Sequence, residues 1–358
     1  MISRWVVPLA LGALLASCAS ERPQRISPSD ARAFIDQSLP SYVSDRGEWA
    51  DDIYTAFSAQ HLEPTHENVC AVVAVIEQES NFHVNPVIPG LPGIAWKEIH
   101  ARAERSHVPW MLVETAVGLK SPNGLSYGAR IDRARTEKDL SDIYEDFIGS
   151  VPLGQTLFAD HNPIRTRGPM QVNIAFLKQT PAARSYPYPM KESAADELFT
   201  RRGSVYFGIA HLLGYTAPYP GYLYRFADYN AGQYASRNAA FQNALSIASG
   251  KPLTADGALL PAGGGVGDTE TAARELSDKL NLRVDDIHDS LAQGKSADFE
   301  RTTLYQRVFA LAERSQGRPE PRALLPKIKL QGPKITRNLT TQWYARRVDG
   351  RFQQCLKR

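Results

Sequence analysis

Two carboxylates close an apolar segment near residue 80, and they are the side chains best suited to acid–base chemistry. An apolar run covers residues 69–76, and Glu77 and Glu79 follow it. In a helix Glu79 shares a face with Ile76 and Val72, which precede it by three and seven residues. Burial at the end of that face would raise the pKa of the carboxyl, as a general acid for a glycosidic oxygen requires. Spacing leaves two alternatives open: Glu77 as the semi-buried acid, or two solvent-facing carboxylates at a helix end.

Two further clusters combine residue types that bind sugars. In the first, Gly168 permits close backbone approach, while Met170 and Gln171 offer an adaptable apolar group and an amide. In the second, Tyr229 and Asn230 are adjacent and offer stacking area together with hydrogen-bond donors and acceptors. Either cluster alone is weak evidence for a binding site, because ordinary packing is the more common role of such residues.

The ordered combination of the three motifs is more specific. Glu-Ser with an aromatic residue two positions on, then Gly-x-Met-Gln, then Tyr-Asn-Ala-Gly resembles the soluble lytic transglycosylases of the lysozyme superfamily, over about residues 65 to 245. The resemblance implies that Glu79 is the sole catalytic acid. The remaining roles are substrate-binding, and they fall on Ser80, Met170, Gln171, Tyr229 and Asn230.

The same resemblance implies the reaction. Glu79 would protonate the oxygen between N-acetylmuramic acid and N-acetylglucosamine, and would then act as base while the muramyl C6 hydroxyl attacks its own anomeric carbon. The product is a 1,6-anhydro sugar. Hydrolysis would instead need a second carboxylate, for which Asp228 and Asp160 are the candidates.

The chain departs from that family in one major respect. The second motif normally follows the glutamate after a short hairpin, whereas here residues 83–165 intervene. We expect this segment to be a large insertion that covers, narrows or blocks the cleft. Pro169 also stands where leucine is common, which still suits a turn.

The N-terminus has the pattern of an export signal. A positive charge at Arg4 precedes an apolar run over residues 5–15, too short for a permanent membrane span. Leu-Ala-Ser-Cys at residues 15–18 resembles a bacterial lipobox, which implies cleavage after residue 17 and acylation of Cys18. Ala19 then implies the outer membrane, where we expect the protein on the periplasmic face. The alternative is an ordinary cleaved signal in which Cys18 is incidental.

The body of the chain has helical periodicity and no sustained strand alternation. The spacing predicts one continuous helix over 222–249 and three short helices between 269 and 316. We expect a mainly α protein: a membrane tether at 18–28, a lysozyme-like domain at 29–250, a Gly-rich linker at 251–268, and a helical C-terminal extension at 269–358. The extension ends in a basic tail from Lys327 to Arg358, either a solvated surface or a binding site for anionic lipid, lipopolysaccharide or acidic glycan.

Two cysteines remain once Cys18 is assigned to lipid. Cys70 and Cys355 can form a disulfide in an oxidising compartment or remain two buried thiols. The spacing of His and Cys residues predicts no metal site, and we expect no cofactor. A net charge of +3 gives no indication of nucleic-acid binding.

These observations favour an envelope lipoprotein that binds and cleaves peptidoglycan strands and contacts the membrane through Cys18. Two alternatives remain: a non-catalytic glycan-binding module with a filled cleft, and a lipoprotein acting in uptake or envelope interaction. No sequence feature identifies a protein partner.

Overall fold

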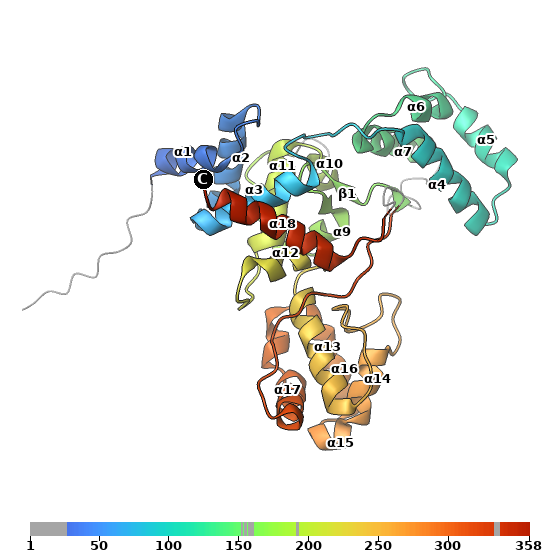
Figure 1. The fold of residues 1–358 in the computed structure, drawn as a ribbon. Helices are drawn as coiled ribbons and strands as arrows, with labels where there is room; N and C mark the ends of the chain where they lie inside the picture. The colour runs from blue at the N-terminus through green and yellow to red at the C-terminus, as the bar shows by residue number, and fades with distance from the viewer. Residues whose placement is uncertain (1–26, 152, 154–155, 157–160, 191–192, 333–336) are drawn as a thin grey trace, which may run out of the picture.

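The computed structural model describes residues 27–151, 153, 156, 161–190, 193–332 and 337–358. In these residues the protein is mainly helical, and its strands form one two-stranded hairpin. Figure 1 shows three groups of helices: a central one, a lobe at the upper right and a bundle below. The expected acylation site, Cys18, lies outside the described residues.

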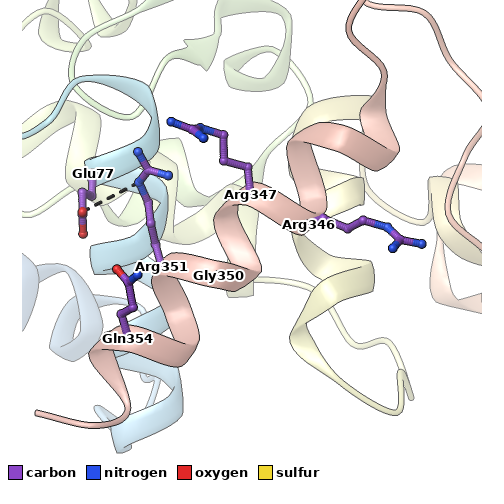
Figure 2. A pocket seen from close by; sticks show the side chains of 6 residues that line it. All are labelled: Glu77, Arg346, Arg347, Gly350, Arg351 and Gln354. Atoms are coloured by element: carbon purple, nitrogen blue, oxygen red, sulfur yellow. Dashed lines mark ion pairs between the residues drawn. The ribbon is translucent and has the colours of Figure 1, made fainter.

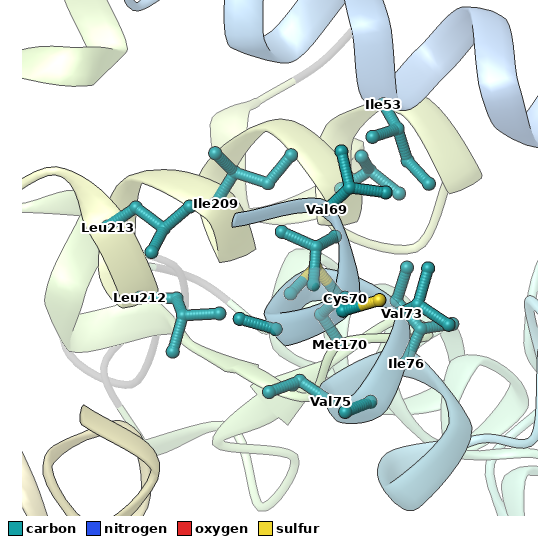
Figure 3. Packing of buried hydrophobic residues seen from close by; sticks show 14 of the residues in the cluster. Ile53, Val69, Cys70, Val73, Val75, Ile76, Met170, Ile209, Leu212 and Leu213 are labelled. Atoms are coloured by element: carbon teal, nitrogen blue, oxygen red, sulfur yellow. The ribbon is translucent and has the colours of Figure 1, made fainter. Parts of the chain in front are cut away.

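The central group is built around α3 (His66–Glu79). Thr65 caps its N-terminus by accepting from the backbone N of Asn68 at 3.2 Å. All residues of α3 from Val69 to Ile76 are fully buried, which explains why the apolar run has no polar face (Figure 3). Around it lie α1 (Pro28–Ser38), α2 (Arg46–Ala59), α9 (Ile174–Leu177), α10 (Ala194–Glu197), α11 (Arg201–Leu213) and α12 (Tyr222–Ala231).

The hairpin joins β1 (Thr166–Arg167) to β2 (Val172–Asn173) through a turn that begins at Gly168. Gly168 has a φ of +72°, and a Cβ on it would lie 1.9 Å from the carbonyl oxygen of Leu198. The turn therefore requires glycine both for its left-handed backbone and for its contact with the segment before α11.

We expect Gly168→Ala to lower the free energy of unfolding by about 2–4 kcal/mol, since a side chain adds backbone strain and a steric clash. Denaturant unfolding measures the loss. The matched control is Gly93→Ala in α4, where a Cβ meets nothing within 4 Å. Equal stability of the two variants would contradict the packing described here.

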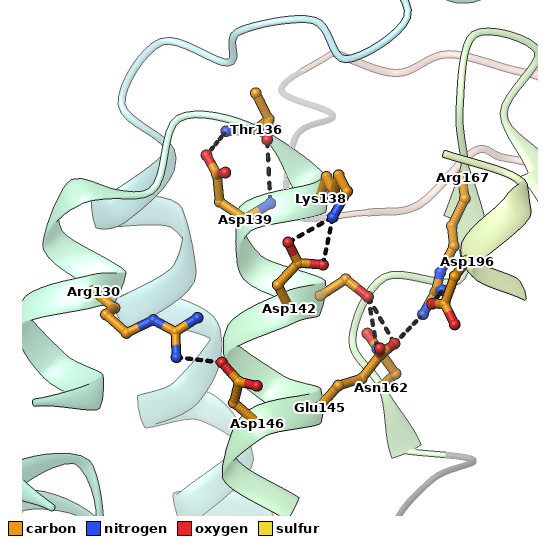
Figure 4. Close-up of polar contacts among 11 residues, drawn as sticks. Arg130, Thr136, Lys138, Asp139, Asp142, Glu145, Asp146, Asn162, Arg167 and Asp196 are labelled. Atoms are coloured by element: carbon orange, nitrogen blue, oxygen red, sulfur yellow. Dashed lines mark hydrogen bonds and ion pairs between the residues drawn. The ribbon is translucent and has the colours of Figure 1, made fainter. Parts of the chain in front are cut away.

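The expected insertion forms a lobe with its own small core. It contains α4 (Leu91–Arg105), α5 (Trp110–Gly118), α6 (Tyr127–Arg133) and α7 (Glu137–Ser150). Tyr127 and Leu91 are among the buried residues at its centre. An ion pair joins the lobe to the hairpin, since Arg167 contacts Glu145 of α7 at 2.8 Å, and Arg167 also contacts Asp196 of α10 in the central group at 3.0 Å (Figure 4). Residues 83–165 thus brace the hairpin from the side.

A second core lies in the bundle below. The C-terminal half of α13 (Ala235–Ser249) packs there against α14 (Asp268–Glu275), α15 (Ser277–Leu280), α16 (Val284–Ala292) and α17 (Thr303–Gln316), with 3-10 turns at Gln293–Lys295 and Ala297–Arg301. The predicted continuous helix over 222–249 is wrong, because Gly232, with a φ of +110°, ends α12 before α13 begins.

The segment predicted as a Gly-rich linker is fixed against α13 where the structure describes its hydrogen bonds. The Gln242 side chain donates to Asp256 Oδ1 at 2.9 Å and to the carbonyl of Ala258 at 3.0 Å, and accepts from the backbone N of Gly257 at 2.7 Å. One buried amide therefore holds this part of residues 251–268 in place.

The C-terminal residues do not form a basic tail. Residues 341–355 fold into α18 (Thr341–Cys355), which leaves the bundle and packs between α3 and α12 in the central group (Figure 1). Its buried residues Tyr344, Ala345, Val348 and Phe352 join the central core. The predicted extension 269–358 is thus two pieces that belong to two cores.

A disulfide joins α3 to α18. Cys70 and Cys355, separated by 285 residues, are bonded, which confirms the first of the two alternatives for these cysteines. In the described residues no helix is both long and apolar enough to span a bilayer.

Candidate functional site

Glu79 is the last residue of α3 and is partly exposed at the end of the buried helix. The chain turns sharply after it, since Asn81 and Phe82 have φ values of 49° and 62°. Left-handed backbone at a non-glycine aromatic residue is strained and is tolerated only where the surroundings enforce it. The ring of Phe82 packs edge-on against the ring of Trp49, with 5.2 Å between the ring centres. This packing fixes the turn that follows Glu79.

The C-terminal helix supplies the nearest partner of Glu79. The hydroxyl of Tyr344 donates a hydrogen bond to Glu79 Oε1. Burial, followed by the negative charge of Glu79 and that hydrogen bond, raises the pKa of Tyr344 well above its ordinary value. Tyr344 is therefore a protonated donor throughout the physiological range, and it belongs to the site although the motif analysis missed it.

Tyr229 of α12 is also affected by the charge of Glu79. Its hydroxyl donates to the carbonyl of Met170 at 2.7 Å, and its pKa is raised well above its ordinary value by burial and by the charge of Glu79. The first, second and third motifs therefore meet in space. Met170, however, does not line a sugar groove: its side chain is fully buried, and it packs so closely on Gly208 of α11 that an added Cβ there would lie 2.3 Å from its sulfur.

The other predicted substrate-binding residues are engaged with the protein. The Ser80 hydroxyl is buried and donates to the carbonyl of Ile76 at 3.1 Å, so it closes the helix end. Asn230 is exposed, and its Oδ1 accepts from the Thr341 hydroxyl of α18 at 2.7 Å. Ser80 thus stabilises the helix end that carries Glu79, whereas Asn230 remains at the surface.

Gln171 links the hairpin to the insertion. Its amide nitrogen donates to Glu137 of α7 at 3.1 Å and to the carbonyl of Gly168 at 3.2 Å, and its oxygen accepts from Thr166 at 2.8 Å. With a φ of 50°, its backbone is also left-handed. Gln171 therefore holds the turn of the second motif in position, where we expected a sugar contact.

Of the two alternative carboxylates, Asp228 is not available as a second catalytic group. Asp228 is fully buried and accepts from the hydroxyls of Tyr215 and Tyr219 at 2.9 and 2.7 Å and from the backbone N of Tyr234 and Ser236. Burial raises its pKa, against the effect of these donors. Asp228 therefore fixes the turn after α12, and Asp160 lies outside the described residues.

His211 of α11 lies beneath Tyr229. The two rings are 4.8 Å apart, and His211 Nε2 donates to the carbonyl of Tyr229 at 3.1 Å. Burial lowers the pKa of His211 to about 4, against the raising effect of that hydrogen bond. The ring is neutral at pH 7 and serves as packing under the site.

We expect His211 to make the protein sensitive to acid. Because the unfolded chain binds this proton near pH 6.5 and the folded chain only near pH 4, the free energy of unfolding should fall between those values by about 3 kcal/mol. Denaturant titrations from pH 7.5 to 4 measure the slope. His211→Gln, which retains a donor for Tyr229, should flatten it, whereas the exposed control His107→Gln should not. An unchanged slope in His211→Gln would assign the sensitivity to other groups.

The comparisons with known proteins agree on one family. The chain is 51% identical over 349 residues to the uncharacterized protein YaiW of Escherichia coli (strain K12), covering 96% of this chain and 95% of that protein. No solved structure matches it significantly. The family described as protein of unknown function (DUF1615) matches residues 42–358, a range that contains Glu79, the hairpin, Tyr229 and α18. The chain therefore belongs to the DUF1615 family.

Proposed function

We propose that this protein is a peptidoglycan lytic transglycosylase with a lysozyme-like central unit and Glu79 as its one catalytic carboxyl. The observation that carries the proposal is the meeting of the three motifs at one point. There Glu79 ends a buried helix and accepts a hydrogen bond from Tyr344. Burial and the charge of Glu79 raise the pKa of Tyr229, whose hydroxyl donates to the Met170 carbonyl. The Tyr344 hydrogen bond fixes the orientation of this partly buried carboxyl of Glu79, and a carboxyl held in place can transfer a proton to and from a sugar oxygen.

A single carboxyl is sufficient for this reaction. Glu79 protonates the glycosidic oxygen as the bond to the muramyl anomeric carbon breaks. It then takes the proton of the C6 hydroxyl as that oxygen bonds to the same carbon. No water enters, so no second carboxylate is required, in keeping with the engagement of Asp228 in its turn. Tyr344 positions Glu79 through its hydrogen bond.

Membrane attachment is part of the proposal. Cys18 would carry the acyl chains that hold the protein at the outer membrane, on its periplasmic face, where glycan strands are within reach. The described residues begin at 27, inside the expected tether at 18–28, and α1 begins at Pro28.

A second candidate is a glycan-binding module without turnover. It is favoured by the position of α18, which engages Glu79 through Tyr344 and Asn230 through Thr341. Residues expected to face sugar are thus contacted by this helix, and Gln171 is contacted by Glu137 of the insertion.

Mass spectrometry of purified peptidoglycan after incubation with the protein separates the candidates. We expect muropeptides that end in 1,6-anhydro-N-acetylmuramic acid. Reducing-end products would overturn the proposal in favour of a hydrolase. Strand binding by co-sedimentation without any product would establish the binding module.

A further inference from the structure

An open surface pocket of about 430 Å³ lies along α18 beside the candidate site. Three guanidinium groups and one carboxylate line it, together with an amide and a glycine: Glu77, Arg346, Arg347, Gly350, Arg351 and Gln354. Figure 2 shows Arg347 and Arg351 projecting to the side of α18 on which Glu77 lies, and Arg346 projecting away. The described lining therefore carries an excess of positive charge.

The positive charge of the three arginines is only partly balanced by the one carboxylate of the pocket, Glu77. Arg351 Nε lies 3.8 Å from Glu77 Oε1, beyond hydrogen-bond distance, and this buried nitrogen has no hydrogen-bond acceptor in the described part of the chain. The Arg347 guanidinium lies 5.6 Å from the ring centre of Trp343, which is itself 37% exposed. Two guanidinium groups one helical turn apart are suited to a planar oxyanion.

The pocket and the candidate site lie along the same helix, α18. Tyr344, which contacts Glu79, is followed on the same helix by Arg347 after one turn and by Arg351 after two. At a rise of about 1.5 Å per residue, these positions lie roughly 5 and 10 Å along α18 from Tyr344. About three extended peptide residues would span that distance.

We propose that Arg347 and Arg351 bind a carboxylate of the peptide stem attached to the muramic acid whose bond is placed at Glu79. This inference rests on the proposed function and specifies its substrate as strands that still carry their peptides. In a glycan strand the peptide is carried only by the muramyl sugar. Binding of that carboxylate about 5 to 10 Å from Tyr344 would therefore also fix the position of the glycan strand relative to Glu79, because only the muramyl sugar carries a peptide.

Binding of two strand preparations tests the inference without requiring turnover. One is peptidoglycan glycan with intact stem peptides, and the other is the same glycan after enzymatic removal of the peptides. The full protein, purified in detergent, should bind the first about tenfold more tightly at low salt. R347Q/R351Q should abolish that preference, and added salt should reduce it.

Two single variants serve as controls for the double variant. R314Q removes an exposed arginine of α17 and should retain the preference. R347Q alone changes an exposed side chain and should reduce the preference even if the double variant does not fold. Equal binding of both preparations by the unmodified protein would overturn the inference, whether or not the protein cleaves glycan.

A third arm uses vesicles that contain an anionic phospholipid. Loss of vesicle binding in R347Q/R351Q, with strand binding unchanged, would overturn the peptide assignment and make the pocket a site for lipid phosphate. Absence of anhydro products together with the expected strand preference would refute the transglycosylase proposal and leave the pocket assignment intact.

Discussion

Glu79→Gln is expected to reduce the release of anhydro-muropeptides from purified peptidoglycan by about 10³-fold. Glutamine keeps the shape and can accept the Tyr344 hydrogen bond, but it cannot exchange a proton with the glycosidic oxygen or the C6 hydroxyl. General acid–base groups contribute about 10²–10⁴-fold to such reactions. Initial rates from the anhydro-sugar signal, normalised to protein bound on the strands, measure the effect.

The matched control is Glu67→Gln. Glu67 lies exposed in the first turn of the same helix, so this variant changes the same side chain away from the site and should keep full activity. Strand binding by Glu79→Gln should stay within about twofold of the unmodified protein. Full turnover by Glu79→Gln, with turnover lost in Glu77→Gln, would transfer the role to the other carboxylate of α3.

Replacing both bonded cysteines, as Cys70→Ser and Cys355→Ser together, should lower the free energy of unfolding by about 4–5 kcal/mol. The bond joins residues 285 positions apart, and constraining so long a loop removes much of the entropy of the unfolded chain. For a chain of this size we expect the melting temperature to fall by roughly 6 °C. Calorimetry or far-ultraviolet circular dichroism measures it.

Reduction supplies the control for that prediction. A thiol reductant should lower the melting temperature of the unmodified protein by a similar amount and should leave the double variant unchanged. Cys18 remains in both proteins, so a contribution from it cancels. Identical melting of the variant and the oxidised protein would show that packing alone holds α18 on α3.

Local sequence signals predicted the α3 end of the site well. The unbroken apolar run and the two glutamates after it place Glu79 at the end of a buried helix, and that is where it lies. The mainly helical character followed from periodicity, whereas the bond between Cys70 and Cys355 was one of two alternatives that the sequence left open.

The contribution of α18 to the site was not predicted, because the charged residues of this segment hid the helical spacing of its apolar residues. Its buried apolar residues are Tyr344, Ala345, Val348, Phe352 and Cys355. They recur at helical spacing behind a Thr340 cap, but arginines and other polar residues fill most of the positions between them. Spacing also gives no information on which distant helix will pack against α3. The role of Met170 was misjudged for a related reason, since only the packed structure shows Gly208 opposite its sulfur.

The order of the chain has a consequence for when the site can exist. Tyr344 and Cys355 lie within the last fifteen residues, whereas Glu79 and Cys70 lie in the first quarter. A nascent or prematurely terminated chain can fold α3 and still lack the phenol that contacts its glutamate. The bond that fastens the last helix also requires an oxidising compartment. Completion of the site is thereby tied to full synthesis of the chain, and the covalent attachment of its last helix is tied to oxidising conditions.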